Sequence, residues 1–276
     1  MSTSALVELA LAEDIGPGDL TSALIPADHQ GRAVLLAKTS LVFSGSEVFE
    51  MVFSQVDPSV QVRFHHSDGA SLEPGTEVAE VTGPTRSLLI GERTALNFVQ
   101  RLSGVATMAR AASSAVSGSR ARVVDTRKTT PGFRVLEKAA VVHGGAANHR
   151  FGLFDGVMVK DNHVDAMGGI GPAVAAARRV AHHLVKIEVE VRSLAELDAA
   201  LEARADVVLL DNMDDATLRA AVEKNRGAER PAVLEASGGV TLERLPDLAD
   251  TGVDLISMGA LTHSAPAADL SLKYRS

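Results

Sequence analysis

The first third of the chain mixes helical and strand-like patterns of apolar residues without a regular order. Apolar residues three or four positions apart indicate helices, and apolar residues at every second position indicate strands. Such a mixture predicts an α+β domain over about residues 1–104. In chain order we expect a helix over 1–13, a turn-rich loop over 14–19, a strand over 31–38, a helix over 47–56, strands over 61–64 and 73–82, and a long helix over about 84–117 with Gly104 as a candidate break.

From residue 121 onward, strand-like and helical patterns alternate regularly, which favours a parallel sheet with right-handed crossovers. The strands are rich in Val, Ile and Leu and do not alternate with polar residues, as in a sheet that is buried on both faces. We expect strands at 121–124, 155–159, 185–191, 206–210, 232–236 and 253–258, and helices at 172–183, 194–203, 216–224 and 242–250.

About six such units predict an incomplete α/β barrel of six to seven strands over about residues 105–264. An open, doubly wound sheet is the competing architecture, because the same alternation of elements can form it. Residues 265–276 are expected to return to the N-terminal domain.

Residues 123–163 form the most informative stretch, and they read as strand, turn, helix, glycine-rich loop and strand. Thr130 before Pro131 predicts an N-cap with proline at the first helical position. Apolar residues then follow at helical spacing until Gly144 and Gly145 end the helix. Five potential cations lie at the ends of these elements, in an otherwise acidic chain. They are Arg127, Lys128, His149, Arg150 and Lys160, and they predict a site for a small molecule with several negative charges.

Polar residues and glycines also follow the C-terminal ends of the predicted strands. Because the chemistry of α/β barrels takes place at that rim, these residues are candidates for one common site. They are Asp125, Lys160, Glu190, Asp211, the segment 235–239 and Gly259.

Composition narrows the possible functions. The chain of 276 residues carries a net charge of −8 and only 3% aromatic residues, which argues against a nucleic-acid-binding surface. It has no cysteine, so a thiolate nucleophile, a thiolate metal site and a disulfide framework are excluded. The N-terminus lacks the pattern of a signal peptide, and no apolar run is long enough to cross a membrane. We therefore expect a cytoplasmic protein.

Three motifs, DTRKTTPGFR, NHRFG and VKDNH, occur in an order and at a spacing that resemble quinolinate phosphoribosyltransferase, and the similarity extends from about Leu11 to the end of the chain. The resemblance implies transfer of a phosphoribosyl group from phosphoribosyl diphosphate to quinolinate with decarboxylation, which gives nicotinate mononucleotide, diphosphate and CO₂ in NAD biosynthesis. It also implies a Mg²⁺ cofactor and a homodimer, or a hexamer built as a trimer of dimers.

The resemblance also assigns roles to residues of this chain. The quinolinate carboxylates are placed on Arg127, His149, Arg150, Lys160 and, from a partner subunit, Arg93. Mg²⁺ is placed at Glu190 and Asp211, which count as catalytic together with Lys128 and Lys160. Further substrate contacts are assigned to Thr126 and Lys128, the ribose 5-phosphate to Ser237, Gly238, Gly239 and Gly259, and the diphosphate to His263.

Each candidate also has a plainer interpretation. Lysine and arginine are most often solvated, Lys160 could form a structural ion pair, and lone glycine turns are weak signals. Lys160 could instead be a Schiff-base lysine. Glu188 shares a strand face with Glu190 and could replace it as a ligand, whereas Arg134 and Lys138 are read only as one face of a helix.

Other functions remain open at this level. The nearest alternative is a related phosphoribosyltransferase that takes another base, like the molybdenum-operon homologues of the family. A Lys160 Schiff-base lyase and a non-catalytic sensor of phosphorylated metabolites are more distant alternatives.

Overall fold

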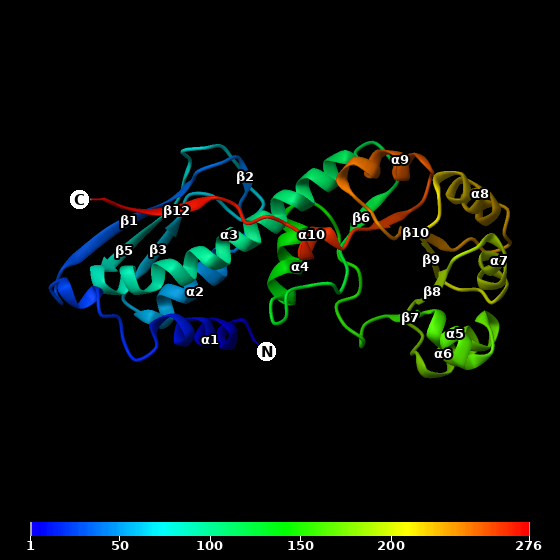
Figure 1. Cartoon of the computed structure of the whole chain (residues 1–276), viewed down its shortest axis with the longest axis horizontal. Coiled ribbons are helices and arrows are strands. Elements are labelled where there is room, and N and C mark those ends of the chain that lie inside the picture. Colours follow the sequence, from blue (N-terminus) through cyan, green and yellow to red (C-terminus); the bar gives the residue numbers. More distant parts are fainter. Residues whose placement is uncertain (1, 276) are drawn as a thin grey trace. The chain divides into compact units, whose positions relative to one another are not determined.

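The computed structural model describes residues 2–275 and divides into two compact units. Of the described residues, the first unit comprises 2–110, 129–145 and 261–275, and the second comprises 111–128 and 146–260. Figure 1 shows the order of their elements. No helix in the described part of the chain is long and apolar enough to cross a membrane.

The first unit is built around a four-stranded antiparallel sheet with the order β12-β1-β5-β3. Its aromatic core includes Phe43, Phe49 and Phe53, all fully buried. The C-terminal strand β12 pairs with β1 from Arg32↔Arg275 to Ala37↔Leu270, so the last strand of the described chain belongs to this sheet. The elements of the unit are α1 (Thr3–Ile15), η1 (Ser22–Leu24), β1 (Gln30–Ala37), β2 (Leu41–Val42), α2 (Ser46–Val56), β3 (Gln61–Phe64), β4 (Ser71–Leu72), β5 (Glu77–Pro84), most of α3 (Thr85–Ala115), α4 (Arg134–His143) and β12 (Leu270–Arg275).

Helix α3 runs without a break through Gly104, so the candidate break at this residue was wrong. The glycine is required for packing: a Cβ atom at this position would collide with the carbonyl oxygen of Pro266. The backbone of the C-terminal segment therefore passes directly over α3, where Ala268 N–H donates to the Gln100 carbonyl at 2.9 Å. Glycine serves close approach here, at the cost of some helix propensity.

Helix α4 begins at Arg134, three residues later than an N-cap at Thr130 would place its start, so that prediction was also wrong. Thr130 instead donates from its backbone N–H (3.0 Å) and its hydroxyl (2.8 Å) to the carboxylate of Glu137. Glu137 is fully buried, and its carboxylate also accepts a hydrogen bond from Arg101 Nη2 at 2.7 Å. Lys138 is only 2% exposed, so the face read from Arg134 and Lys138 is not a solvated one.

The second unit contains a six-stranded parallel sheet with the order β6-β11-β10-β9-β8-β7. From β7 to β11 each strand lies beside the next one along the chain, so the order does not reverse as it would in a doubly wound sheet. The expected parallel, barrel-like sheet is confirmed, with six strands. They are β6 (Arg122–Val124), β7 (Val157–Val159), β8 (Ile187–Val191), β9 (Val207–Asp211), β10 (Val233–Ser237) and β11 (Leu255–Ser257).

Two of the helices between these strands, α7 and α8, begin with side-chain caps close to the ends of β8 and β9. Ser193 accepts a hydrogen bond from the backbone N–H of Glu196 at 3.2 Å, and Asp214 accepts one from Thr217 at 2.8 Å. Such caps fix where each helix starts, and with it the loop that leads from the strand. The helices are α5 (Asp161–Met167), α6 (Ile170–Val180), α7 (Leu194–Glu202), α8 (Asp215–Arg226), η2 (Leu242–Arg244) and α9 (Leu245–Asp250). Helix α10 (Ala260–His263) follows β11, and neither it nor α5 was expected from the sequence.

Candidate active site

The register of the parallel strands brings the predicted polar residues of the second unit to one edge of the sheet. Val159 pairs with Val189, which places Lys160 of the β7 end beside Glu190 of β8. Ser237 pairs with Asp211 in the same way, at the ends of β10 and β9. Because all six strands run in the same direction, their C-terminal ends share this edge, as the sequence predicted.

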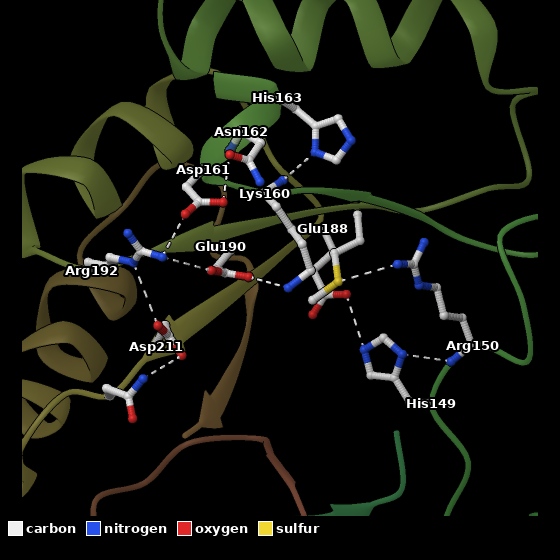
Figure 2. Close-up of polar contacts among 12 residues, drawn as sticks. His149, Arg150, Lys160, Asp161, Asn162, His163, Glu188, Glu190, Arg192 and Asp211 are labelled. Atoms are coloured by element: carbon white, nitrogen blue, oxygen red, sulfur yellow. Dashed lines mark hydrogen bonds and ion pairs between the residues drawn. The ribbon is translucent and has the colours of Figure 1, made fainter. Parts of the chain in front are cut away.

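A network of charged side chains connects the ends of β7, β8 and β9 (Figure 2). Lys160 Nζ lies 2.6 Å from Glu190 Oε2. Arg192, two residues after Glu190, donates from Nη2 to Asp161 Oδ2 at 2.8 Å. The same guanidinium lies 3.6 Å from Glu190 Oε1 and 3.6 Å from Asp211 Oδ2. Glu190 and Asp211, the predicted metal ligands, thus face the same positive charge.

The network holds Asp161 in its charged form. The Asn162 backbone N–H and the Arg192 guanidinium both bond this carboxylate and lower its pKa. The bond to Asp161, followed by the charges of Glu190 and Asp211, raises the pKa of Arg192. Asp161 is therefore the strongest anchor of the Arg192 side chain.

Three further titratable residues form a buried cluster deeper in the sheet: His149 Nε2 lies 3.1 Å from Glu188 Oε2 and 3.6 Å from Glu235 Oε2. Glu188 and Glu235 are 6% and 1% exposed. Within the described residues, neither carboxylate oxygen of Glu235 has a hydrogen-bond partner. Burial, followed by the negative charge of Glu188, raises the pKa of Glu235 to about 7.

Hydrogen bonds assign the protons of the His149 ring. Its Nδ1 accepts the backbone N–H of Arg150 at 2.7 Å, which requires a lone pair on Nδ1. The ring proton then sits on Nε2 and is donated to Glu188. Burial lowers the pKa of His149, but the bond to Glu188 and the charges of Glu235 and Glu188 outweigh it and raise the pKa. Protonation of Nδ1 would therefore also break the bond to Arg150.

The loop that carries His149 and Arg150 is held by buried and local contacts. Asp125 is fully buried and accepts the backbone N–H of His149 at 2.9 Å. Asp155 closes the turn by accepting the N–H groups of Phe151 at 2.6 Å and Gly152 at 2.9 Å.

Arg150 is oriented by its own side-chain contacts, since Nη1 donates to the Gly156 carbonyl at 3.0 Å. Burial lowers the pKa of Arg150, and the positive charge of Arg127 lowers it further. The second effect is the repulsion between two guanidinium groups of like charge.

The loop after β10 has a backbone conformation that favours glycine. Gly238 and Gly239 both have a positive φ, +98° and +58°. A Cβ atom at Gly238 would collide with the side chain of Asn212, which itself has the left-handed φ of 54°. Such conformations in a non-glycine residue concentrate at functional sites.

The remaining predicted residues fall into two groups. Thr126, Lys128 and Gly259 belong to the second unit, and Thr126 Oγ1 accepts the backbone N–H of Lys128 at 3.0 Å. Arg93 and His263 belong to the first unit, and both are exposed.

Comparison with known proteins shows which family the chain belongs to. The models of the N-terminal and C-terminal domains of quinolinate phosphoribosyl transferase match residues 19–103 and 105–273. The chain belongs to the quinolinate phosphoribosyltransferase family. The resemblance seen in the three sequence motifs is thereby confirmed.

Relatives of the family match the chain over nearly its whole length. A probable nicotinate-nucleotide pyrophosphorylase [carboxylating] of Bacillus subtilis is 47% identical over 94% of this chain and 89% of its own. The human nicotinate-nucleotide pyrophosphorylase [carboxylating] is 45% identical over 99% of this chain and 92% of its own. The structure of the nicotinate-nucleotide pyrophosphorylase from Francisella tularensis superimposes with a TM-score of 0.95 at 39% identity, covering 99% of this chain and 96% of that one.

Sequence reasoning missed several residues that the structure brings to this quinolinate phosphoribosyltransferase-like site. Arg192 lies two positions after Glu190 and could have been found from strand alternation, which places both on one face. Glu188 was considered only as a substitute for Glu190, and Glu235 only as part of a strand end. Their pairing with His149 depends on the order of β8, β9 and β10 in the sheet, and no local signal in the sequence shows that order.

Proposed function

We propose that this chain transfers the 5-phosphoribosyl group of phosphoribosyl diphosphate to the ring nitrogen of quinolinate. The bond from the anomeric carbon to the diphosphate oxygen breaks, and its electron pair leaves with diphosphate. The pyridine nitrogen forms the new bond to that carbon. One carboxylate then departs as CO₂, its electron pair stays on the ring carbon beside the cationic nitrogen, and a proton completes nicotinate mononucleotide.

The observation that carries this proposal is the side-by-side placement of two kinds of charge at one edge of the sheet. Arg150 and Lys160 supply positive charge, and Glu190 and Asp211 on the next strands supply carboxylates. Positive side chains can bind a dicarboxylate, and carboxylates can bind the metal ion that accompanies a diphosphate. No protein nucleophile is required, so catalysis rests on positioning and on fixed charges.

Within this proposal, Arg127 and Arg150 hold the carboxylates of quinolinate, because a guanidinium binds a carboxylate through two parallel hydrogen bonds. Both ring nitrogens of His149 are bonded inside the protein. We therefore revise its role from a direct substrate ligand to a residue that positions the backbone of Arg150. Lys160 bonds Glu190, which is the structural ion pair considered from the sequence, and it would turn toward substrate only by leaving that partner.

Glu190 and Asp211 fit a Mg²⁺ ion by the chemistry of their donors. They offer hard carboxylate oxygens on adjacent strand ends, and a guanidinium already occupies the position between them as a cation. Mg²⁺, when bound, would supply positive charge beside the departing diphosphate. The backbone of Ser237, Gly238, Gly239 and Gly259 would take the ribose phosphate, and His263 the diphosphate. A homodimer would complete the site with Arg93 of a second copy.

The deciding experiment mixes the purified protein with quinolinate, phosphoribosyl diphosphate and Mg²⁺ and measures the release of CO₂ and diphosphate. We expect both products in equal amounts together with nicotinate mononucleotide. Turnover with other pyridine or pyrimidine acids but not with quinolinate would instead assign the chain to a relative with another base. Borohydride trapping of Lys160 by a carbonyl substrate would indicate a lyase.

A further inference from the structure

Arg192 occupies the position between the two carboxylates that the proposed function gives to a metal. Its guanidinium contacts three acidic side chains at once, those of Asp161, Glu190 and Asp211 (Figure 2). No role for this residue follows from the cation cluster or from the strand-end motifs.

The three contacts differ in strength. The bond to Asp161 is short at 2.8 Å, whereas Glu190 and Asp211 are each 3.6 Å away. An N–O distance of 3.6 Å is too long for a hydrogen bond but still a close contact of opposite charges. Arg192 can therefore leave Glu190 and Asp211 while it keeps Asp161.

The backbone of Arg192 is fixed, and its side chain is not. Its N–H donates to Glu196 Oε2 at 2.6 Å, in the capped first turn of α7. The side chain, in contrast, is 55% exposed. It also borders a cavity of about 460 Å³ whose lining combines four acidic residues, Asp161, Asp165, Glu190 and Glu196, with apolar ones such as Val164 and Ile170. This cavity provides space for a displaced guanidinium, and its carboxylates provide opposite charge.

We propose that Arg192 is a built-in counter-cation that competes with a divalent metal for Glu190 and Asp211. The inference rests on the proposed function, because it takes these two residues as the metal ligands. With the guanidinium in place, a bare divalent cation meets a site whose charge is largely neutralised. A metal that arrives with a diphosphate brings phosphate oxygens that can bind Arg192 in turn. Metal and diphosphate then bind as one unit, and the substrate-free protein holds its metal weakly.

The test measures the binding of Mn²⁺ alone to the substrate-free protein, by titration calorimetry and by the electron spin resonance signal of the unbound ion. We expect Arg192→Gln to bind Mn²⁺ roughly tenfold more tightly than the wild type, as expected for removing one like charge at contact distance in a hydrated site. The double variant Glu190→Gln/Arg192→Gln should lose this gain, which would locate the ion. Thermal melts of each variant confirm that the fold is intact.

Arg230→Gln is the matched control, because Arg230 contacts Asp206 at 3.4 Å and is similarly exposed, at 61%, but it lies beyond the N-terminal end of β10. It should leave Mn²⁺ binding unchanged. Equal or weaker Mn²⁺ binding by Arg192→Gln, or a gain that survives the Glu190 replacement, would overturn the proposal. The proposed function fails by a different result, the absence of CO₂ and diphosphate release by the wild type with both substrates and Mg²⁺.

Discussion

At the scale of single residues, the two guanidinium groups assigned to quinolinate differ in what else they do. Arg127 is exposed, whereas Arg150 is half-buried and bonds the Gly156 carbonyl at 3.0 Å. Removing Arg150 should therefore also loosen the loop that carries it.

We expect Arg127→Ala and Arg150→Ala each to abolish quinolinate binding by calorimetry. The melting temperature should fall by a few degrees for Arg150→Ala, which loses the hydrogen bond to the Gly156 carbonyl, worth about 1 kcal/mol. Arg219→Ala, on the exposed side of α8, is a suitable control. Near-normal turnover of either site variant would contradict the assignment.

Glu235 makes stability depend on pH in a predictable direction. Its pKa is raised from the model-compound value of 4.5 to about 7, so the folded protein binds an extra proton between these two values. The stability contributed by that proton is fully present below about pH 4.5 and is lost as the pH rises through about 7. The shift corresponds to about 3 kcal/mol in the free energy of unfolding.

Glu235→Gln should therefore unfold at a denaturant concentration similar to that of the wild type at pH 5, and at a clearly higher one at pH 8. Urea titrations across this range measure the difference. Parallel curves for the two proteins would show that Glu235 titrates at an ordinary pKa.

At the scale of elements, periodicity predicted every strand of the parallel sheet to within about two residues, because buried Val, Ile and Leu runs leave little ambiguity. The errors arose where tertiary contacts replaced local rules. Thr130 looks like an N-cap but bonds Glu137, and Gly104 looks like a helix break but admits the Pro266 carbonyl. Pro266 lies far along the chain from Gly104. Glu137 is only seven residues after Thr130, but it is buried against Arg101, and no local pattern shows that contact.

Gly104→Ala should destabilise the protein by at least 1–3 kcal/mol, because overpacking against a backbone carbonyl cannot be relieved by a side-chain rotation. Gly171 in α6 is the matched control, because a Cβ atom there meets nothing within 4 Å. Gly171→Ala should be neutral or should stabilise by up to about 1 kcal/mol. Chemical denaturation compares the two variants, and equal effects would refute the packing argument.

The residues of the candidate site could be predicted only in part from the sequence. Lys160, Glu190 and Asp211 could be predicted from the sequence to lie at one edge of the sheet, because each is at or just after the C-terminal end of an apolar strand. The contacts of His149 with Glu188 and Glu235 could not be predicted, because they depend on which strands are neighbours in the sheet. Arg192 was missed because arginines after strands are common and usually solvated.

At the scale of the whole molecule, a C-terminal strand completes the sheet that is otherwise formed by the N-terminal strands. Strand β12 forms an edge of the sheet of the first unit, with Leu270 and Leu272 buried and Lys273 exposed. From the sequence we predicted only that residues 265–276 return to the N-terminal domain. We did not predict a strand there, because six residues of mixed polarity carry little strand signal by themselves.

Leu272→Ala should lower the free energy of unfolding by about 2–5 kcal/mol, the usual cost of emptying a buried leucine site. Lys273→Ala, the next residue on the opposite face of the strand, should change it by less than about 0.5 kcal/mol. A small effect of Leu272→Ala in thermal unfolding would mean that β12 contributes little to the fold.

The fixed tautomer of His149 has a practical consequence. At a pH where the ring is neutral, one ring nitrogen is pyridine-like and the other pyrrole-like, so the two should give widely separated ¹⁵N resonances, and the Nε2 proton should exchange slowly with deuterium oxide. Any ligand that moves the Arg150 backbone must disturb this pair of signals. His149 therefore offers a native spectroscopic reporter of site occupancy, with no label attached to the ligand.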